Sequence, residues 1–221
     1  MKILNLYSCL GGNRYKWNEV KNDIEVTAVE LDEELAKLYQ ERFPNDKVIV
    51  ADAHQYLLDH YKEYDFIWSS PPCPTHSVTN HFLNAKGIVR YPDMTLYQQI
   101  ILLKTFFKGR FCVENVKPYY MPLIPAKIRA RHLYWTNFNL PNILSTRKAP
   151  NMNMNTKSKG VVSAFLKYHK IENLITKYKG KQSKGKIARN LVDYEAGKTI
   201  LETVLNINKN NYMQKGLFDE N

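Results

Sequence analysis

A chain of 221 residues is long enough for one domain with a small insert, and 44% hydrophobic residues allow an ample core. No run approaches the ~18 consecutive apolar residues of a membrane helix, so no membrane span is expected. The net charge of +11 instead favours polyanionic partners.

The three cysteines, Cys9, Cys73 and Cys112, are odd in number and widely spaced. They predict no disulfide framework and indicate a reducing, cytoplasmic setting. Met1 leads straight into a strand-like segment, which leaves no room for a signal peptide. A monomer is the simplest expectation.

Strand-like and helix-like segments alternate through the first 120 residues. Strands are predicted over 2–7, 23–29, 47–50, 64–68 and 111–113, and helices over 33–39, 54–61 and 96–107. This rhythm predicts a parallel sheet covered on both faces by helices. Ligands bind such sheets at the carboxyl ends of the strands, where the motifs below all fall.

The positive charge is concentrated late in the chain. Between Asn142 and Ala188, eleven Lys or Arg accompany one acid, Glu172, so the rest of the chain is nearly neutral. A basic segment beside a neutral body suggests a polyanion-binding face on a catalytic core, with a solvated lysine-rich surface as the alternative. The predicted parts are a catalytic and cofactor domain at 1–141, a small irregular basic target-recognition segment at 142–186, a C-terminal helix at 187–205 and a tail at 206–221.

Three consecutive strand ends carry residues that suit an adenosyl cofactor. Gly11 and Gly12 form a turn where the backbone can approach a ligand. Glu30 could accept hydrogen bonds from both ribose hydroxyls, Asp52 could accept from the adenine amino group, and Leu31 could pack on the ring. Helix capping is the alternative for both acids. Since Gly-x-Gly-x-x-Gly is incomplete, S-adenosylmethionine fits better than a dinucleotide.

A thiol and a carboxylate follow two further predicted strands. Cys73 comes after a Pro-Pro turn, and Glu114 ends the strand at 111–113. A thiolate can add to C6 of cytosine while a carboxylic acid donates a proton at N3, which makes C5 electron-rich. A zinc half-site at Cys73-x-x-His76 is the alternative, but zinc needs about four ligands and the sequence offers no second pair.

These motifs resemble, in identity and order, those of the DNA cytosine-5 methyltransferases, in a small phage- or bacterial-type form. The similar segments are residues 6–12, Val29-Glu30-Leu31-Asp32, Ala51-Asp52-Ala53, Ser70-Pro71-Pro72-Cys73, Glu114-Asn115-Val116, residues 129–138 and Arg189-Asn190-Leu191-Val192. The resemblance implies an α/β fold, namely a Rossmann-like S-adenosylmethionine-dependent methyltransferase sheet with a short basic DNA-recognition insert.

The resemblance also implies an activity. A methyl group would pass from S-adenosylmethionine to C5 of cytosine in double-stranded DNA, through base flipping and a covalent bond from cysteine to C6. The implied partners are double-stranded DNA and S-adenosylmethionine, with a cognate restriction enzyme as a further candidate and no metal. An RNA (tRNA) cytosine-5 methyltransferase and a catalytically silent DNA-binding homologue remain as alternatives.

Site residues follow from the matching motifs. Cys73 would be the nucleophile, Glu114 would contact N3 and the exocyclic amine, and Asn115 would hold the Cys73 loop. The residues expected to line the cofactor site are Tyr7, Ser8, Gly11, Gly12, Glu30, Leu31, Asp52, Ala53, Pro72, Asn190 and Val192.

The arginine motif has two possible registers. Counting back from Trp135 places His132 at the position of the family's second arginine. A one-residue shift places Arg131 there, and we assign Arg131 as the catalytic arginine, with Arg129 as second choice. The chain also departs from the family pattern at Pro74, where glutamine is usual, and at Arg189, where glycine is usual.

Overall fold

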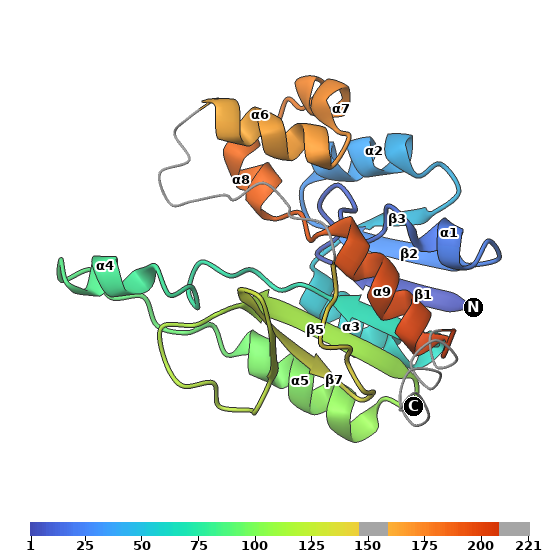
Figure 1. The fold of residues 1–221 in the computed structure, drawn as a ribbon, viewed down its shortest axis with the longest axis horizontal. Coiled ribbons are helices and arrows are strands. Elements are labelled where there is room, and N and C mark those ends of the chain that lie inside the picture. Colours follow the sequence, from blue (N-terminus) through green and yellow to red (C-terminus); the bar gives the residue numbers. More distant parts are fainter. Residues whose placement is uncertain (146–158, 208–221) are drawn as a thin grey trace, which may run out of the picture.

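The computed structural model describes residues 1–145 and 159–207, which form a seven-stranded sheet with helices on both faces (Figure 1). The strands lie in the order β3-β2-β1-β4-β5-β7-β6. They are β1 Lys2–Leu6, β2 Glu25–Glu30, β3 Lys47–Val50, β4 Phe66–Ser69, β5 Arg110–Val116, β6 Lys127–Arg129 and β7 His132–Thr136. The predicted α/β class is confirmed.

The helices follow the strands closely along the chain. They are α1 Trp17–Val20, α2 Glu33–Arg42, α3 Ala53–His60, the 3-10 helix η1 Tyr61–Glu63, α4 Asn80–Asn84, α5 Thr95–Phe106, α6 Lys159–Tyr168, α7 Glu172–Thr176, α8 Lys184–Arg189 and α9 Tyr194–Val204. No helix within residues 1–145 and 159–207 is long and apolar enough to cross a membrane.

The strands of the sheet contribute to two cores because successive side chains point to opposite faces. Leu4 of β1 packs with Ile100 of α5 on one face, which α3 also covers. Ile3 of β1 packs with Trp17 of α1 and Ile200 of α9 on the other. The first strand is therefore buried on both sides, and α1 and α9 meet over one face of the sheet.

The expectation of a wholly parallel sheet is wrong at one edge. β1 to β5 are mutually parallel, but β7 runs antiparallel to β5 and β6 antiparallel to β7. The antiparallel pairing of β6 with β7 follows from their connection, a tight turn in which Ala130 has a φ of 50°. A turn this short can join only antiparallel strands, whereas a parallel pair needs a long crossover.

The predicted C-terminal helix at 187–205 is two helices. α8 ends at Arg189, and α9 begins after Asp193, whose carboxylate accepts from the Glu195 N–H at 2.9 Å. This side-chain cap satisfies a backbone donor that would otherwise be free at the start of the helix. Residues 190–193 are thus left as a non-helical connection.

Much of the described part of the basic segment is helical, where an irregular segment was predicted. α6, α7 and α8 pack on α2 through a third apolar cluster that joins Leu35 and Leu38 to Phe165, Ile175 and Ile187. The remainder of the segment, at 146–158, and most of the predicted tail, at 208–221, lie outside the described residues.

Candidate active site

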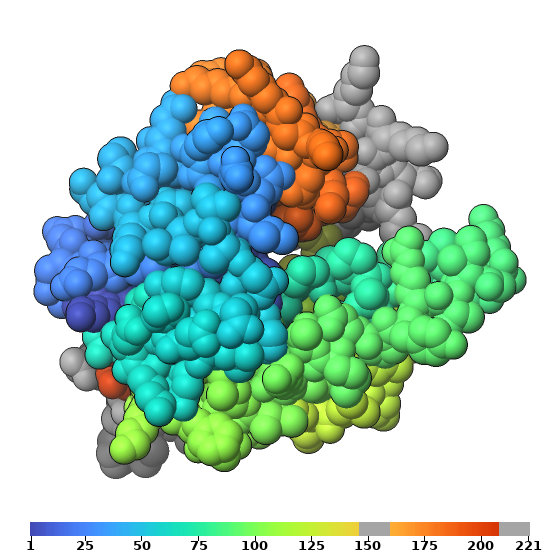
Figure 2. All heavy atoms as spheres, turned by 180° about the vertical axis from the view of Figure 1, so that it is seen from behind, coloured from blue at the N-terminus to red at the C-terminus, as the bar shows by residue number. Residues whose placement is uncertain are grey.

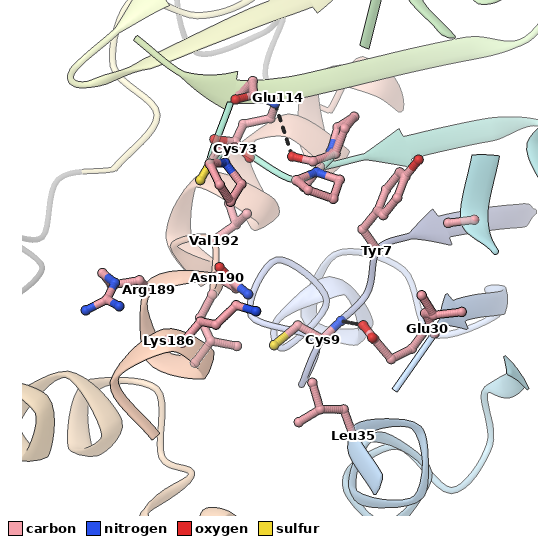
Figure 3. A pocket seen from close by; sticks show the side chains of 18 of the residues that line it. Tyr7, Cys9, Glu30, Leu35, Cys73, Glu114, Lys186, Arg189, Asn190 and Val192 are labelled. Atoms are coloured by element: carbon pink, nitrogen blue, oxygen red, sulfur yellow. Dashed lines mark hydrogen bonds between the residues drawn. The ribbon is translucent and has the colours of Figure 1, made fainter. Parts of the chain in front are cut away.

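A cavity of about 840 Å³ lies at the carboxyl ends of the parallel strands. α8 and the connection to α9 form its other wall (Figure 3). The predicted site residues that line it are Tyr7, Glu30, Leu31, Asp52, Ala53, Pro72, Cys73, Glu114, Asn115, Arg131, Asn190 and Val192. Four predicted residues, Ser8, Gly11, Gly12 and Arg129, are not in its lining.

The loop after β4 presents Cys73 to this cavity. Asn115 at the end of β5 donates its side-chain amide to the Pro71 carbonyl at 3.1 Å. The backbone N–H of His76 donates to the Cys73 carbonyl at 3.0 Å. These two bonds hold the chain on either side of the thiol.

His76 anchors the same loop from behind. Its Nδ1 lies 2.6 Å from the Tyr120 hydroxyl, and burial lowers the pKa of His76, which favours the neutral ring. Among the described residues, no group of three or more His, Cys, Asp or Glu side chains could hold a metal ion.

The surroundings of Cys73 act on its ionisation in both directions. Burial raises the pKa of the Cys73 thiol, and the carboxylate of Glu114 raises it further. The guanidinium groups of Arg189 and Arg131 act in the opposite sense. Desolvation disfavours a thiolate and nearby positive charge favours it, so the two arginines offset part of the cost of burial.

Glu114 faces His132 across the β5–β7 pair. Oε1 of Glu114 lies 3.6 Å from Nε2 of His132, and the Glu114 side chain is only 7% exposed. The sheet register causes this proximity, since His132 pairs with Val116, two residues along from Glu114 on the same face of β5. His132 also lines the cavity.

The neighbouring arginines are placed differently. Arg131 lines the cavity. Arg129, the second choice for the catalytic arginine, instead donates to the Leu140 carbonyl at 2.9 Å and to Asn142 Oδ1 at 3.2 Å. Its guanidinium therefore secures the chain after β7 and lies outside this cavity.

Glu30 lies at the cavity end formed by β2 and β3. Its Oε2 accepts from the Cys9 N–H at 2.8 Å and its Oε1 from the Asp32 N–H at 3.0 Å. Burial raises the pKa of Glu30. Each carboxylate oxygen has further acceptor capacity, so two hydroxyl donors can still be received.

Asp52 combines helix capping with a place in the cavity lining. Its Oδ1 accepts from the Gln55 N–H at 2.8 Å at the start of α3. Between Asp52 and Glu30, the side chain of Leu31 is 69% exposed and lines the cavity. An apolar surface flanked by two carboxylates is thus available to a flat, hydrogen-bonding ligand.

The Gly-Gly turn supports the cavity from behind. A Cβ on Gly12 would lie 2.4 Å from the Val192 carbonyl oxygen, and Gly11 has a φ of 66° with the Phe43 ring against its α-carbon. Only glycine permits this close approach and this backbone conformation. The turn therefore lets the connection from α8 to α9 lie directly on the end of β1.

A family model for C-5 cytosine-specific DNA methylases matches residues 1–120, more than half of the chain. The chain belongs to this methylase family. The resemblance inferred from the sequence motifs is thereby confirmed. No curated protein matches the chain.

One solved methyltransferase structure shares the fold of this methylase over nearly its whole length. EhMeth of Entamoeba histolytica superposes with a TM-score of 0.53 at 11% identity, covering 95% of this chain and 99% of that one. A Spodoptera frugiperda DNMT2 mutant is 28% identical with a TM-score of 0.37, covering 52% of this chain and 35% of its own. A TehB-like SAM-dependent methyltransferase of Corynebacterium glutamicum is 17% identical with a TM-score of 0.36, covering 55% and 58%. The predicted Rossmann-like methyltransferase sheet is confirmed.

Several lining residues of the methylase cavity were missed from the sequence. They are Cys9, Asp32, Leu35, Lys181, Gln182, Lys186, Arg189 and Leu191. Most belong to the basic segment or lie just after it. From its composition alone, this segment was predicted to bind nucleic acid. The sequence shows both the basic charge and the Arg189-Asn190-Leu191-Val192 motif. It does not show that the two form one wall of the cavity, because that depends on how α8 packs.

A strap from the basic segment closes one rim of the cavity. Oδ2 of Asp32 accepts from the Tyr178 hydroxyl at 2.6 Å and from the Gln182 side-chain amide at 3.0 Å. Burial opposes ionisation of Asp32, but these hydrogen bonds outweigh it and lower the pKa of Asp32. Lys177 pairs with Glu41 on α2 beside them. Residues 177–182 are thus held against α2.

Proposed function

We propose that this methylase transfers a methyl group from S-adenosylmethionine to C5 of cytosine in double-stranded DNA. The observation that carries the proposal is that Cys73 and Glu114 line the same cavity as Glu30, Leu31 and Asp52. One cavity thus holds a nucleophile and an acid together with carboxylates and an apolar surface that suit an adenosine. Membership of the family supports the reaction class, since the match covers the residues of both groups.

The residues present fit the proposed cofactor. Glu30 keeps acceptor capacity for ribose hydroxyls, Asp52 has a second carboxylate oxygen beyond its helix cap, and Leu31 offers an exposed apolar surface to a ring. When bound, S-adenosylmethionine would supply the electrophilic methyl group. The connection at 190–192 would close the pocket around it.

The chemistry of the chain's own residues can be written as balanced steps. Cys73 adds as a thiolate to C6 of the base, while Glu114 delivers a proton to N3, so that electron density collects at C5. After C5 is methylated, a base, for which bulk water suffices, removes the C5 proton, and the Glu114 carboxylate takes back the proton from N3. The electron pair of that C–H bond restores the double bond and expels the thiolate of Cys73.

The target base would have to leave the helix to reach this thiol. Cys73 lies within a cavity rather than on a protruding surface, and a stacked base cannot enter one. Seen from behind, the segment that contains α4 projects from the body of the protein (Figure 2). Its length would allow it to contact the strand from which the base is drawn.

Nucleoside mass spectrometry tests the proposal. The protein and S-adenosylmethionine are incubated with unmodified duplex DNA and, separately, with tRNA, with Cys73→Ala as the control. We expect 5-methylcytosine in the DNA only, and none with the variant. Product in tRNA alone would move the function to RNA, and product formed by Cys73→Ala would overturn the mechanism. No modified base in either would favour a silent homologue.

A further inference from the structure

The cavity carries positive charge at the wall opposite Glu30. Lys186 of α8 lines it, and its side chain points toward Cys9 (Figure 3). The neighbouring Arg189 points away from Cys9 in the same view. Within the described residues, no hydrogen bond or ion pair engages the Lys186 ammonium group. Lys186 is itself exposed, so water solvates its ammonium group, and that group is available to an anionic part of a ligand in the cavity.

The helix α8 holds Lys186 in this place. The backbone N–H of Lys186 donates to the Ser183 side chain at 3.2 Å as the N-terminal cap of the helix. The next residue, Ile187, is buried, and its carbonyl lies 3.9 Å from the Cys9 sulfur. The backbone of Lys186 is therefore fixed against the turn after β1, and only the side chain of Lys186 can move.

The proposed cofactor has one group that this cation suits. Glu30, Leu31 and Asp52 account for an adenosine, and the reacting methyl must face Cys73. The remaining end of the molecule is an amino acid, whose carboxylate needs a positive or donor partner. The wall left for it is the one that carries Lys186 and Asn190.

We propose that Lys186 binds the α-carboxylate of the cofactor and so makes the site selective for adenosyl ligands that carry this group. The inference rests on the proposed function and names a specificity residue for it. A charge-assisted hydrogen bond from an ammonium group to a carboxylate supplies the recognition. The match of the family model ends at residue 120, so the assignment of Lys186 comes from the structure.

Calorimetry with two ligands isolates this interaction. S-adenosylhomocysteine is compared with its decarboxylated form, which keeps the adenosine, thioether and amino group. We expect the unmodified protein to prefer the carboxylate ligand. Lys186→Gln should weaken the binding of S-adenosylhomocysteine about tenfold and leave the decarboxylated ligand unchanged. Lys186→Arg should restore most of the affinity.

Lys184→Gln is the matched control, because Lys184 is exposed on the same helix and is not in the cavity lining. Equal binding of S-adenosylhomocysteine by the unmodified protein and Lys186→Gln would overturn the inference and leave the proposed function standing. So would a defect in Lys186→Gln confined to duplex DNA, since a phosphate would then be the partner. Failure of the unmodified protein to bind either adenosyl ligand would overturn the proposed function itself.

Discussion

Cys73 occupies an environment that holds back its ionisation. Burial and the Glu114 carboxylate raise the pKa of the thiol, against the smaller effects of Arg189 and Arg131. A desolvated thiol makes a stronger nucleophile once it has lost its proton, but fewer molecules carry the thiolate at neutral pH. The two arginines therefore tune reactivity as well as any binding they provide.

Alkylation of Cys73 by iodoacetamide should be slow at neutral pH and accelerate about tenfold per pH unit until the raised pKa is passed. The sign follows from the thiolate being the reactive form, whose fraction grows with pH. Arg189→Gln should move the profile to higher pH. Mass spectrometry of the modified peptide is specific, because Cys9 and Cys112 are buried. A faster rate than that of free cysteine at pH 7 would contradict the assignment.

Among the described residues, His132 is the basic side chain that lies within 4 Å of the Glu114 carboxylate, where the sequence motif favoured Arg131. The pair across β5 and β7 can hold the carboxyl group in position for N3 of a base. A hydrogen-bonding partner for a buried carboxyl group contributes more than the partner of an exposed one would. His132 therefore fills a role that the motif register left open.

Replacing His132 with alanine should lower the single-turnover rate by roughly 10- to 100-fold, with little change in cofactor affinity. His132→Arg should retain much of the rate, because a guanidinium can also face Glu114. Arg129→Ala should instead lower the melting temperature, since Arg129 secures the chain after β7. Rapid-quench kinetics measures the single-turnover rates, and a thermal melt measures the stability of Arg129→Ala. An unchanged rate for His132→Ala would exclude a role for His132 in catalysis.

At the scale of elements, α9 is joined to the turn after β1 by unusually close backbone packing. A Cβ on Gly197 would lie 2.1 Å from the Asn13 carbonyl oxygen, and the Gly197 carbonyl accepts from the Trp17 indole at 3.2 Å. A side chain at this position would force the helix away from the sheet. Residues 190–192, which form the cavity wall, would move with it.

Gly197→Ala should therefore destabilise the protein by about 1–3 kcal/mol, even though alanine favours a helix by about 1 kcal/mol. Gly185→Ala in α8 is the matched control, because its nearest neighbour would be 3.6 Å away. It should be neutral or mildly stabilising. Chemical denaturation measures the free energy of unfolding of both variants. Equal changes in this free energy would show that the close packing at Gly197 does not determine stability.

The strand ends of the site could be predicted from sequence because each follows a buried apolar run. Glu30, Asp52, Cys73 and Glu114 are fixed by such local patterns. The hairpin of β6 and β7 was not predicted. β6 has three residues, too few to show the alternation that would have indicated a strand paired with β7. The place of Lys186 could not be predicted, since it depends on α8 packing against a turn about 178 residues earlier.

At the scale of the whole molecule, the basic charge is divided between two locations. Lys181, Lys186 and Arg189 line the cavity, and Lys177 is paired with Glu41 on α2. Exposed lysines of the basic segment outside these two groups, such as Lys179 and Lys184, are available to phosphates. A nucleic-acid strand approaching Cys73 would pass this rim, where positive charge attracts it and salt screens the attraction.

Neutralising Lys177, Lys179 and Lys181 together should flatten the dependence of log affinity for duplex DNA on log salt by up to ~0.9 for each phosphate that is no longer neutralised. The change should correspond more nearly to two phosphates than to three, because Glu41 already engages Lys177. The control set lies at the amino ends of the strands: Lys2 begins β1, and Lys62 and Lys108 precede β4 and β5. Fluorescence anisotropy over a salt series measures the slopes, and an unchanged slope would place the DNA face elsewhere.

The packing of α9 on the first residues of the chain has a consequence for its synthesis. Trp17 is buried by a helix that begins 177 residues later, and Lys16 pairs with Glu195 at 2.7 Å. Translation must therefore proceed beyond Val204 before that face of β1 is shielded from water. For most of its time on the ribosome the growing chain presents an apolar surface, the kind that chaperones bind.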